Sequence, residues 1–536
     1  MTPAGGYDAI VVGGGHNGLV AAGYLARAGL RAVVLERRSI VGGAAVSEHP
    51  FGPDYTITSL SYVVSLLPGD LVHDLRLREH GYHVYPQGPY FAPHADGRYL
   101  QLPNDARRAA SIAQFDPRDV EGLTRYEERM SDLATSLGPL LTVSPPRLGS
   151  KRPADLLAQA TLAWRLRGLD TRRAAEATRL FTLSMADLLA EFLHSPQVQG
   201  VLSVSGVIGT WAGPRSPGTA YVMLHHHVGG EPWGFPRGGM GAVTRAMADG
   251  ARSFGAEIRT DAQVSRIATD GGRVTGVVLA GGEEVTAPAV VAATHPRTAF
   301  LDLVDRAELP SDFVSDIERW QTRSGTVKIN LAVDRLPEFT AKPGVNPEVH
   351  GGTIVLAESL DDLEGGFQDA VAGRASTRPF ADIAIPSVLD PTLAPEGRHV
   401  VSMFTQWVPQ EWAASPDPAG LAAHADRVIA RVEAVAPGFT GSILHRQVIG
   451  PHEMEQEYGL VGGNIFHGEL SASQLFHLRP APGYADYRSP VAGLYQAGSA
   501  THGGGGVTGI PGRSAARTLL RDRRRARWGA RLSARG

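Results

Sequence analysis

Cysteine is absent from this chain of 536 residues. Its absence excludes disulfide bonds, thiolate nucleophiles, cysteine-bound metals and a redox-active cysteine pair. The chain also lacks a large excess of charge of either sign, since its formal net charge is only -3. Such a balance provides no field to attract nucleic acid, and no zinc-finger, homeodomain or RNP pattern is present. We therefore expect no nucleic-acid partner.

Long apolar runs are missing as well. The run from Leu60 to Leu67 is interrupted by Ser61, Tyr62 and Ser65, and it is far shorter than the roughly 20 residues of a membrane-spanning helix. The chain enters an apolar strand within about ten residues of its first residue, which leaves no room for a signal sequence. These features predict a cytoplasmic protein.

The last segment, residues 523–536 with the few residues before it, is strongly basic. Six arginines surround the single acid Asp522, namely Arg521, Arg523, Arg524, Arg525, Arg527 and Arg531. A solvated terminal helix that frays is one interpretation, and contact with anionic lipid is the other. Peripheral membrane contact therefore stays open, and the sequence does not predict the oligomeric state.

A glycine-rich turn near the start predicts a dinucleotide site. The β-branched run Ala9 to Val12 is typical of a buried parallel strand. Gly13, Gly15 and Gly18 follow it in the G-x-G-x-x-G spacing, which permits a tight turn, close approach of a pyrophosphate, and close packing of helix on strand. The free amides at the start of that helix would hold the phosphates.

The acid expected in such a site follows at the end of the next strand. Residues 32–35 form an apolar strand, and Glu36 comes directly after it, where its carboxylate would accept the ribose hydroxyls. Gly42, Gly43 and Ser47 are small residues that let the chain pass a second phosphate and the ribityl tail. This continuation favours FAD over NAD, and a ligand-free turn is the alternative.

Cofactor-type segments return twice along the chain. Residues 233–296 read as a glycine turn, helix, strand, hairpin and strand, and residues 493–520 as a strand, four glycines and a helix. A surface loop is the alternative for Gly503 to Gly506. The sequence predicts a discontinuous FAD-binding domain of residues 1–60, 231–298 and 486–522.

Two insertions separate these segments. Residues 61–230 read as a mainly helical lid, because apolar residues recur at roughly helical intervals. They are Leu156, Leu157, Ala160, Ala163 and Trp164, followed by Leu180, Leu183, Leu188, Leu189, Phe192 and Leu193. Residues 299–485 contain alternating strands at 326–333 and 399–407, which predict a sheet that floors a substrate cavity.

Five blocks in order carry a resemblance to a known family. They are GGGHNGLVAAGYLARAGL, ERRSIVGGAAVSE, FPRGGMG, GLVGGNIFHGELSASQLFHLRP and AGSATHGGGGVTG. The chain resembles the phytoene-desaturase-like branch of the flavin amine oxidase superfamily. It is most similar to the group with the pyridine nucleotide-disulfide oxidoreductase domain proteins and one-component β-carotene ketolases.

The resemblance implies an α/β fold: a Rossmann-type FAD-binding domain of the glutathione-reductase-like superfamily, an inserted mixed-sheet substrate domain and a helical lid. It also implies non-covalent FAD and two-electron oxidation of an unactivated or allylic C–H. By position, the cofactor contacts would be Gly13, Gly15, Gly18, Glu36, Gly43, Val264, Gly498 and Val507. Gly42, Ser47 and Gly506 complete the predicted set.

The chain departs from the resemblance at two points. Ala44 follows the glycine pair where amine oxidases have arginine, which weakens amine oxidation as the activity. His502 is followed by Gly503 where the group has His-Pro-Gly-Gly, so the group's usual substrate cannot be assumed.

Few acid and base residues are expected, because the cofactor carries the difficult step. Lys328 is one of three lysines and shares a strand face with Asn330, while Val327, Ile329 and Leu331 share the other. Amine oxidases place a lysine near the flavin, so Lys328 is a candidate for oxygen activation or proton transfer. A solvent-facing lysine is the alternative.

The remaining candidates are polar residues beside the expected cavity. His225, His226 and His227 would alternate faces if they lay on a strand, and no further ligand stands near enough to predict a metal site. We assign His227 and His502 as catalytic candidates, and His225, Trp233, Asn464 and His467 as cavity residues. Gln474 and His477 belong to the same block, and a polar loop covering the core is its alternative interpretation.

Three hypotheses follow. The first is an FAD oxidoreductase that removes hydride from an apolar, polyene or polycyclic, substrate and is reoxidised by oxygen or a quinone. The second is a flavin-bearing interaction protein with little catalysis. The third is an amine or amino-acid oxidase, against which Ala44 argues.

Overall fold

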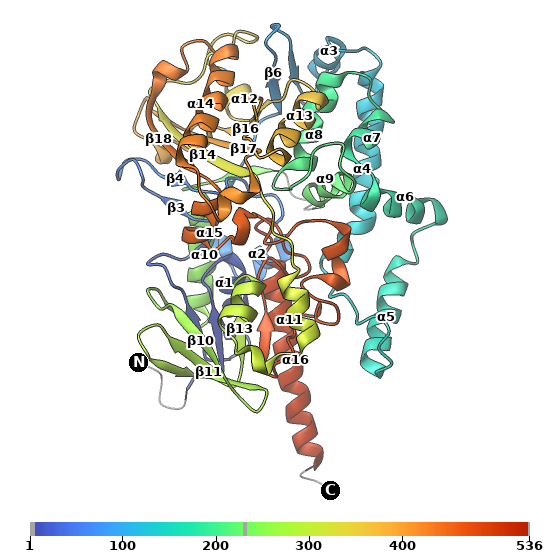
Figure 1. Cartoon of the computed structure of the whole chain (residues 1–536), viewed down its shortest axis with the longest axis vertical. Coiled ribbons are helices and arrows are strands. Elements are labelled where there is room, and N and C mark those ends of the chain that lie inside the picture. Colours follow the sequence, from blue (N-terminus) through green and yellow to red (C-terminus); the bar gives the residue numbers. More distant parts are fainter. Residues whose placement is uncertain (1–5, 229–232, 534–536) are drawn as a thin grey trace.

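The computed structural model describes residues 6–228 and 233–533 (Figure 1). A five-stranded parallel sheet lies in the lower half of that view, and a larger mixed sheet lies in the upper half. Helices of the lid run along the right-hand side. The protein therefore has the α/β architecture expected of a nucleotide-binding domain joined to a second, sheet-based domain.

Strands from widely separated segments form the parallel sheet, in the order β19-β13-β1-β2-β9. The central strand pairs with both neighbours in register, since Val11 lies opposite Val34 on one side and Val291 on the other. The strands are β1 (Ala9–Val12), β2 (Ala32–Leu35), β9 (Glu257–Arg259), β13 (Val290–Ala292) and β19 (Leu494–Gln496). The glycine turn and the carboxyl-terminal strand thus belong to one sheet.

Each face of this sheet has its own core. Ala9 and Val11 face three helices, in which α1 (His16–Arg27) packs between α10 (Met240–Ser253) and α16 (Ile510–Ser533). Ile10 and Val12 face the other side. That side is covered by α11 (Ser311–Glu318) and by the antiparallel strands β10 (Val264–Asp270), β11 (Arg273–Leu279) and β12 (Glu284–Thr286).

The larger sheet has the order β18-β14-β17-β16-β15-β6-β7. Its strands are β18 (Ile443–Ile449), β14 (Thr326–Val333), β17 (His399–Gln406), β16 (Phe380–Ala384), β15 (Thr353–Leu356), β6 (Phe91–Pro93) and β7 (Tyr99–Gln101). β14 has the bounds predicted for it, and β17 ends one residue early. One face packs on α14 (Pro418–Val435). Because β6 and β7 come from the predicted lid, residues 61–230 also contribute strands.

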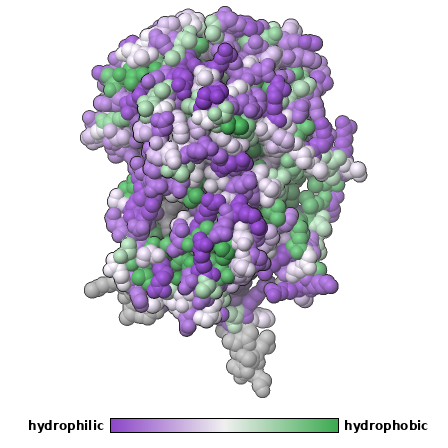
Figure 2. Space-filling model, in the orientation of Figure 1, coloured by the Kyte–Doolittle hydropathy of each residue, from purple (hydrophilic) through white to green (hydrophobic). Residues whose placement is uncertain are grey.

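The lid itself is helical. It comprises α4 (Asp119–Leu141), α5 (Pro153–Leu166), α6 (Thr171–Thr182), α7 (Met185–Ala190), α8 (Pro196–Val207) and α9 (Thr219–His227), and α8 packs on α13 (Leu360–Val371). Among the apolar residues named from the sequence, Leu180 of α6, Leu188 and Leu189 of α7, and Leu193 are buried. Those of α5 are not: Leu156, Leu157 and Trp164 are 48%, 69% and 62% exposed. Figure 2 shows apolar residues gathered where α5 lies.

Shorter elements connect these layers. They are α2 (Gly69–Asp74), α3 (Arg107–Ala113), α12 (Pro347–His350), α15 (Pro451–Tyr458), β3 (Ser47–Glu48), β4 (Ile57–Thr58), β5 (Val84–Pro86) and β8 (Gly234–Pro236). Near the carboxyl end, α16 continues to Ser533 without a break, so the basic segment prolongs the last helix of the sheet domain. Ion pairs from Arg488 to Asp522 and from Arg523 to Asp8 anchor its middle. Within the described residues, no helix is both long and apolar enough to span a membrane.

Candidate functional site

The turn between β1 and α1 is shaped by three glycines. Gly13 has a φ of +100°, which favours glycine, and a Cβ on Gly18 would lie 2.0 Å from the Gly13 carbonyl oxygen. Gly15 faces the second glycine segment, since its backbone forms a bridge with Gly42. A Cβ built on Gly43 would lie 3.3 Å from the Gly15 Cα. The two glycine segments therefore approach closely and leave room above them for a ligand.

Glu36 stands at the end of β2, as predicted, and is 7% exposed. Its carboxylate accepts hydrogen bonds from the backbone N–H of Gly14 at 2.6 Å and of Arg38 at 2.9 Å. The carboxylate is thereby fixed beside the glycine turn. This is the position at which an acid can hold the ribose of a dinucleotide.

A cavity of about 700 Å³ opens over this turn, and we call it the glycine-turn cavity. Six of the predicted cofactor residues line it, namely Gly13, Gly15, Glu36, Gly42, Gly43 and Val264. Six of its lining residues also carry a buried polar atom without a hydrogen-bond partner: His16 Nε2, Asn17 Oδ1, Arg38 Nη1, Thr294 Oγ1, Arg297 Nε and His467 Nδ1. Buried polar groups are costly when unpaired. The cavity is thus suited to a large, polar ligand such as FAD.

Five predicted contacts do not line this cavity. Gly506 and Val507 line a second cavity described below, and the other three have structural roles. The Ser47 hydroxyl accepts the Gly241 N–H at 2.9 Å and donates to the Gly238 carbonyl at 3.3 Å, so it holds the FPRGGMG turn. Gly18 permits helix packing. Gly498 lets its own segment pack closely against the backbone at Thr294, because a Cβ there would lie 2.3 Å from the Thr294 carbonyl oxygen. The side chain next to it, Ser499, reaches the cavity instead.

A second, mainly apolar cavity of about 150 Å³ lies against one face of the larger sheet, and we call it the sheet-face cavity. The predicted cavity residues Trp233 and His467 line it, and so does the catalytic candidate Lys328. Gly506 and Val507, predicted as cofactor contacts, line this cavity and not the glycine-turn cavity. Most other walls are apolar and include Leu60, Val63, Val64, Leu66, Ile208, Phe404, Met454, Leu460, Ile465 and Phe466. The two cavities share four lining residues, His16, Ala44, His467 and Ser499.

Lys328 is buried, with 1% of its surface exposed, so the alternative of a solvent-facing lysine is wrong. Its Nζ donates to Asn330 Oδ1 at 3.0 Å and to the Ser402 hydroxyl. The same Nζ lies 4.8 Å from the centre of the Tyr62 ring. Burial lowers the pKa of this amine to about 7, which makes it a group able to exchange a proton at neutral pH.

Two residues that sequence reasoning missed complete this cluster. Tyr62 donates a hydrogen bond from its hydroxyl to Asp382 Oδ1 at 2.8 Å. Burial raises the pKa of Asp382 to about 6, against the lowering effects of Tyr62 and Lys328. The signal for Asp382 was its place as the charged residue in the otherwise apolar strand FADIA. Nothing local pointed to Tyr62.

The three consecutive histidines lie on a helix, α9, and not on a strand. Their side chains therefore diverge by about 100° per residue. His226 lines the sheet-face cavity, whereas His225 Nε2 donates to the Gly505 carbonyl at 3.2 Å and His227 Nδ1 donates to the Met223 carbonyl at 3.0 Å. His226 therefore takes the place predicted for His225 in the cavity wall, and His227 does not line the cavity, which corrects its assignment as a catalytic candidate.

His502 is also placed elsewhere. Its Nε2 donates to the Leu140 carbonyl at 2.9 Å, and the side chain lines an apolar groove beneath the lid. It does not line the cavity that contains Lys328. In residues 6–228 and 233–533, no group of three or more His, Asp and Glu side chains is arranged to hold a metal ion.

Asn464 supports the site from behind and does not line it. Its Oδ1 accepts the N–H groups of Phe466 and Gly468 at 3.0 and 3.1 Å, and its Nδ2 donates to the Arg323 carbonyl at 2.9 Å. This bonding shapes the loop that places Phe466 and His467 in the cavity wall.

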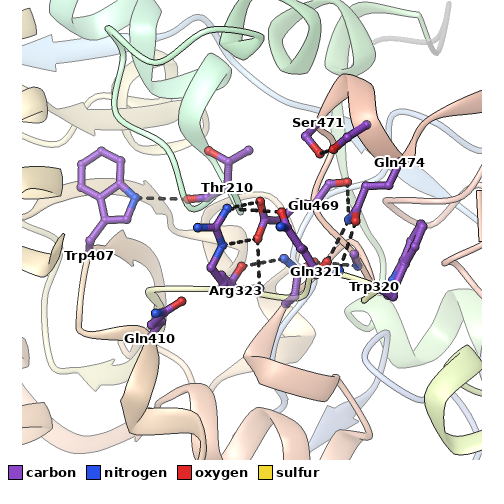
Figure 3. Close-up of polar contacts among 12 residues, drawn as sticks. Thr210, Trp320, Gln321, Arg323, Trp407, Gln410, Glu469, Ser471 and Gln474 are labelled. Carbon is purple, nitrogen blue, oxygen red and sulfur yellow. Dashed lines mark hydrogen bonds and ion pairs between the residues drawn. The ribbon is translucent and has the colours of Figure 1, made fainter. Parts of the chain in front are cut away.

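Polar contacts hold the loop at residues 464–474 to residues 320–323 (Figure 3). Arg323 donates to both carboxylate oxygens of Glu469 at 2.6 and 2.9 Å, and Gln474 donates to the Gln321 carbonyl at 2.8 Å. Trp320 Nε1 donates to the His467 carbonyl at 2.9 Å. His467, which lines both cavities, is therefore fixed from two sides.

Fold and site together define a flavoprotein oxidoreductase, whose glycine-turn cavity would hold FAD beside an apolar cavity. The family described as flavin containing amine oxidoreductase matches residues 18–517. The chain belongs to this family.

Individual proteins similar to this chain are consistent with that family. Pyridine nucleotide-disulfide oxidoreductase domain-containing protein 2 of Rattus norvegicus is 40% identical, with 96% of this chain and 94% of that protein covered. A phytoene desaturase (lycopene-forming) of a Paracoccus strain is 24% identical, with coverage of 96% and 97%. Cyclohexylamine oxidase from Brevibacterium oxydans has a similar fold, with a TM-score of 0.60 and 18% identity over 96% of this chain and 99% of that one. The predicted resemblance is confirmed.

Proposed function

We propose that the protein is an FAD-dependent dehydrogenase or desaturase that moves hydride from a C–H bond of an apolar, polyene or polycyclic, substrate to non-covalently bound FAD. One observation carries this proposal. The apolar sheet-face cavity adjoins the glycine-turn cavity at His16, Ala44, His467 and Ser499. A substrate bound in the sheet-face cavity would therefore meet a cofactor bound in the glycine-turn cavity.

The chain's own residues would bind and orient the substrate and would exclude water from it. FAD supplies, when bound, an acceptor for hydride and its two electrons. Val63, Leu66, Ile465 and Phe466 form apolar walls that position a hydrocarbon and keep water from the reacting carbon. Lys328 is an ionisable group in the cavity wall and is able to take up a proton.

The volume of the cavity bears on substrate size. A space of about 150 Å³ fits a compact apolar group, comparable to a small ring. We therefore propose that the reacting part of the substrate is compact, and that a long polyene requires the lid to open. Oxygen or a quinone is the proposed acceptor that reoxidises the flavin.

Two observations weigh against the other candidate functions. Ala44 lines both cavities at the position after the glycine pair, where amine oxidases have arginine, and it adds no charge to the shared boundary. A cluster of buried ionisable groups against the cavity favours catalysis over a purely binding role, because such groups are costly to bury.

Anaerobic bleaching of the bound flavin tests the proposal. The purified yellow holoprotein is mixed in the absence of oxygen with limonene as a cyclic hydrocarbon, phytoene as a polyene and cyclohexylamine as an amine. Loss of the flavin's visible absorbance with a hydrocarbon supports the proposal. Bleaching by the amine alone would establish the oxidase instead, and a flavin that none of a wider hydrocarbon panel reduces would favour the interaction protein.

The acceptor is identified in the same experiment. After bleaching, air or a soluble quinone is admitted and the return of the visible absorbance is timed. Recovery with either acceptor supports the proposed reoxidation, and peroxide formation identifies oxygen.

A further inference from the structure

One row of side chains crosses three strands on the cavity face of the larger sheet. Lys328 of β14 lies opposite Phe404 of β17, and Phe404 lies opposite Asp382 of β16. Neighbouring strands are about 4.8 Å apart, so the Cα atoms of Lys328 and Asp382 are separated by roughly 10 Å. Phe404 stands between the amine and the carboxylate.

Tyr62 connects the two ends of this row. Its ring lies 4.8 Å from Lys328 Nζ, and its hydroxyl donates to Asp382 Oδ1 at 2.8 Å. One aromatic side chain, delivered by the segment that follows β4, thus touches both ionisable groups. Its own pKa is raised well above the usual value by burial and by Asp382, so the phenol stays protonated.

The other groups around Lys328 do not compete for its proton. Asn330 and Ser402, from β14 and β17, hold Nζ by hydrogen bonds, and Gln447 of β18 receives a hydrogen bond from Asn330. Tyr90 lies near Tyr62 and Asp382, and burial raises its pKa.

Three histidines share the cavity wall with Lys328. Burial lowers the pKa of His16 and of His226 to about 3, and that of His467 to about 4, so all three are neutral at physiological pH. Asp382 is the charged group that favours the ammonium form of Lys328.

We propose that Lys328 is the proton acceptor of the dehydrogenation, and that Tyr62 and Asp382 are positioning residues that set its protonation state. The inference rests on the proposed function. The substrate would lose a hydride, with both electrons, to FAD from one carbon and a proton to the Lys328 Nζ from the adjacent carbon. Two C–H bonds break, one C=C bond forms, and the amine becomes an ammonium ion.

Asp382 would then stabilise the new ammonium across the Tyr62 ring. Because the amine is already uncharged in part of the population near neutral pH, it can accept the proton without a prior step.

The scarcity of lysine gives a direct test. Holoprotein is produced with lysine labelled with ¹³C at Cε, and the chain then shows signals from Lys151, Lys328 and Lys342. Lys328→Arg identifies the relevant signal by its loss. We expect the Lys328 signal to titrate with a midpoint near pH 7.

Two substitutions separate the proposed role from simple burial. Asp382→Asn should lower the titration midpoint of Lys328 by about one pH unit or more, because a nearby negative charge is lost. Tyr90→Phe removes a hydroxyl from the same neighbourhood without touching Lys328 and should leave the midpoint unchanged. Retained flavin absorbance and circular dichroism show that each variant is folded.

The inference is overturned if the Lys328 signal shows no midpoint near pH 7, or if the folded Asp382→Asn variant leaves that midpoint in place. This readout needs no substrate, so its failure is distinct from a failure of the bleaching experiment. With a probe that bleaches the flavin, the bleaching rate should rise with pH through the Lys328 midpoint, and Asp382→Asn should move that rise to lower pH. Lys328→Met should slow bleaching by about 10²- to 10⁴-fold.

Discussion

Glu36 is a side chain whose predicted role in holding the cofactor can be tested directly. Its carboxylate is buried beside the glycine turn and accepts two backbone N–H groups. Glu36→Gln removes the charge, and each lost charge-assisted hydrogen bond to the ribose costs about 1.5–3 kcal/mol. We expect FAD affinity to fall by roughly tenfold to a hundredfold, measured by the ratio of flavin to protein absorbance after dialysis.

A matched control is Glu283→Gln. Glu283 is an exposed acid that pairs with Arg259 outside both cavities, so its loss should leave flavin occupancy at the wild-type level. A Glu36→Gln protein that remains fully yellow would refute the role of the carboxylate in holding the ribose.

At this scale, residues whose roles depend on local spacing were predictable. Gly13, Gly15 and Glu36 lie together because one turn and one strand bring them together. Tyr62 and Asp382 are 320 residues apart, and only the long-range packing of the sheet against the segment after β4 joins them. No local pattern contains that information.

Helix packing across the FAD-binding domain depends on a close contact between α1 and α16. A Cβ on Gly512 would lie 2.0 Å from the backbone oxygen of Asn17, which cannot move aside as a flexible side chain would. We expect Gly512→Ala to lower the free energy of unfolding by about 1–3 kcal/mol, measured by urea denaturation, because the helices must separate.

Gly365 of α13 provides the comparison. Nothing lies within 4 Å of a Cβ built there, so Gly365→Ala should stabilise the helix by about 1 kcal/mol. Equal effects of the two substitutions would show that helix propensity, and not the contact of α1 with α16, decides the outcome.

The bounds of helices and strands could be predicted where a regular sequence pattern was compatible with a single interpretation. The alternation in β14 fixed its bounds and its faces, since Lys328 and Asn330 share the cavity side. Prediction failed where packing decided the outcome. Residues 225–227 end a buried helix, because α9 lies among the other lid helices, and the apolar residues of α5 face outward instead of into a core.

The molecule as a whole buries many neutral histidines. Burial lowers the pKa of His16, His226 and His424 to about 3, and of His225, His467 and His502 to about 4. In the unfolded chain these residues titrate near 6.5, so unfolding takes up protons below that pH. Their contribution is present in full above pH 6.5 and is lost as the pH falls toward 4.

We therefore expect the urea midpoint to fall steeply between about pH 6.5 and pH 5. His424→Gln should reduce the dependence of the urea midpoint on pH, because it removes one of these buried bases. His424 lines neither cavity, so the substitution should leave the cofactor site intact. A midpoint that does not change over this interval would contradict the expectation.

The lid presents an apolar surface surrounded by cations. Leu156, Leu157 and Trp164 are exposed on α5, and Lys151, Arg152, Arg165 and Arg167 flank them. Ion pairs from Arg147 to Asp486 and from Arg488 to Asp486 and Asp522 connect the lid to α16, whose arginines extend the basic region. This combination matches an anionic bilayer surface.

We expect the protein to sediment with phosphatidylserine-containing vesicles and to be released by high salt. Replacing Leu156, Leu157 and Trp164 with serine should abolish this binding. Val371→Ser, at an isolated exposed apolar residue of α13, should not. Equal sedimentation of the triple variant would exclude α5 as the contact.

The domain bounds inferred from the recurring segments remain a prediction, although the observed sheet does contain strands from all three segments. What the sequence could not provide at this scale was the depth of the cavities and their shared wall, because these arise from how the lid, the loop at 464–474 and both sheets meet.

The order of the strands in the parallel sheet has a consequence for biosynthesis. β19, at one edge of that sheet beyond β13, is made nearly five hundred residues after the central strand β1. The nascent chain must therefore keep β1 and α1 from aggregating until β19 and α16 have also been made. A product that stops before Leu494 would lack an edge of the nucleotide-binding sheet and the α16 cover of α1, and we would expect quality control to degrade it.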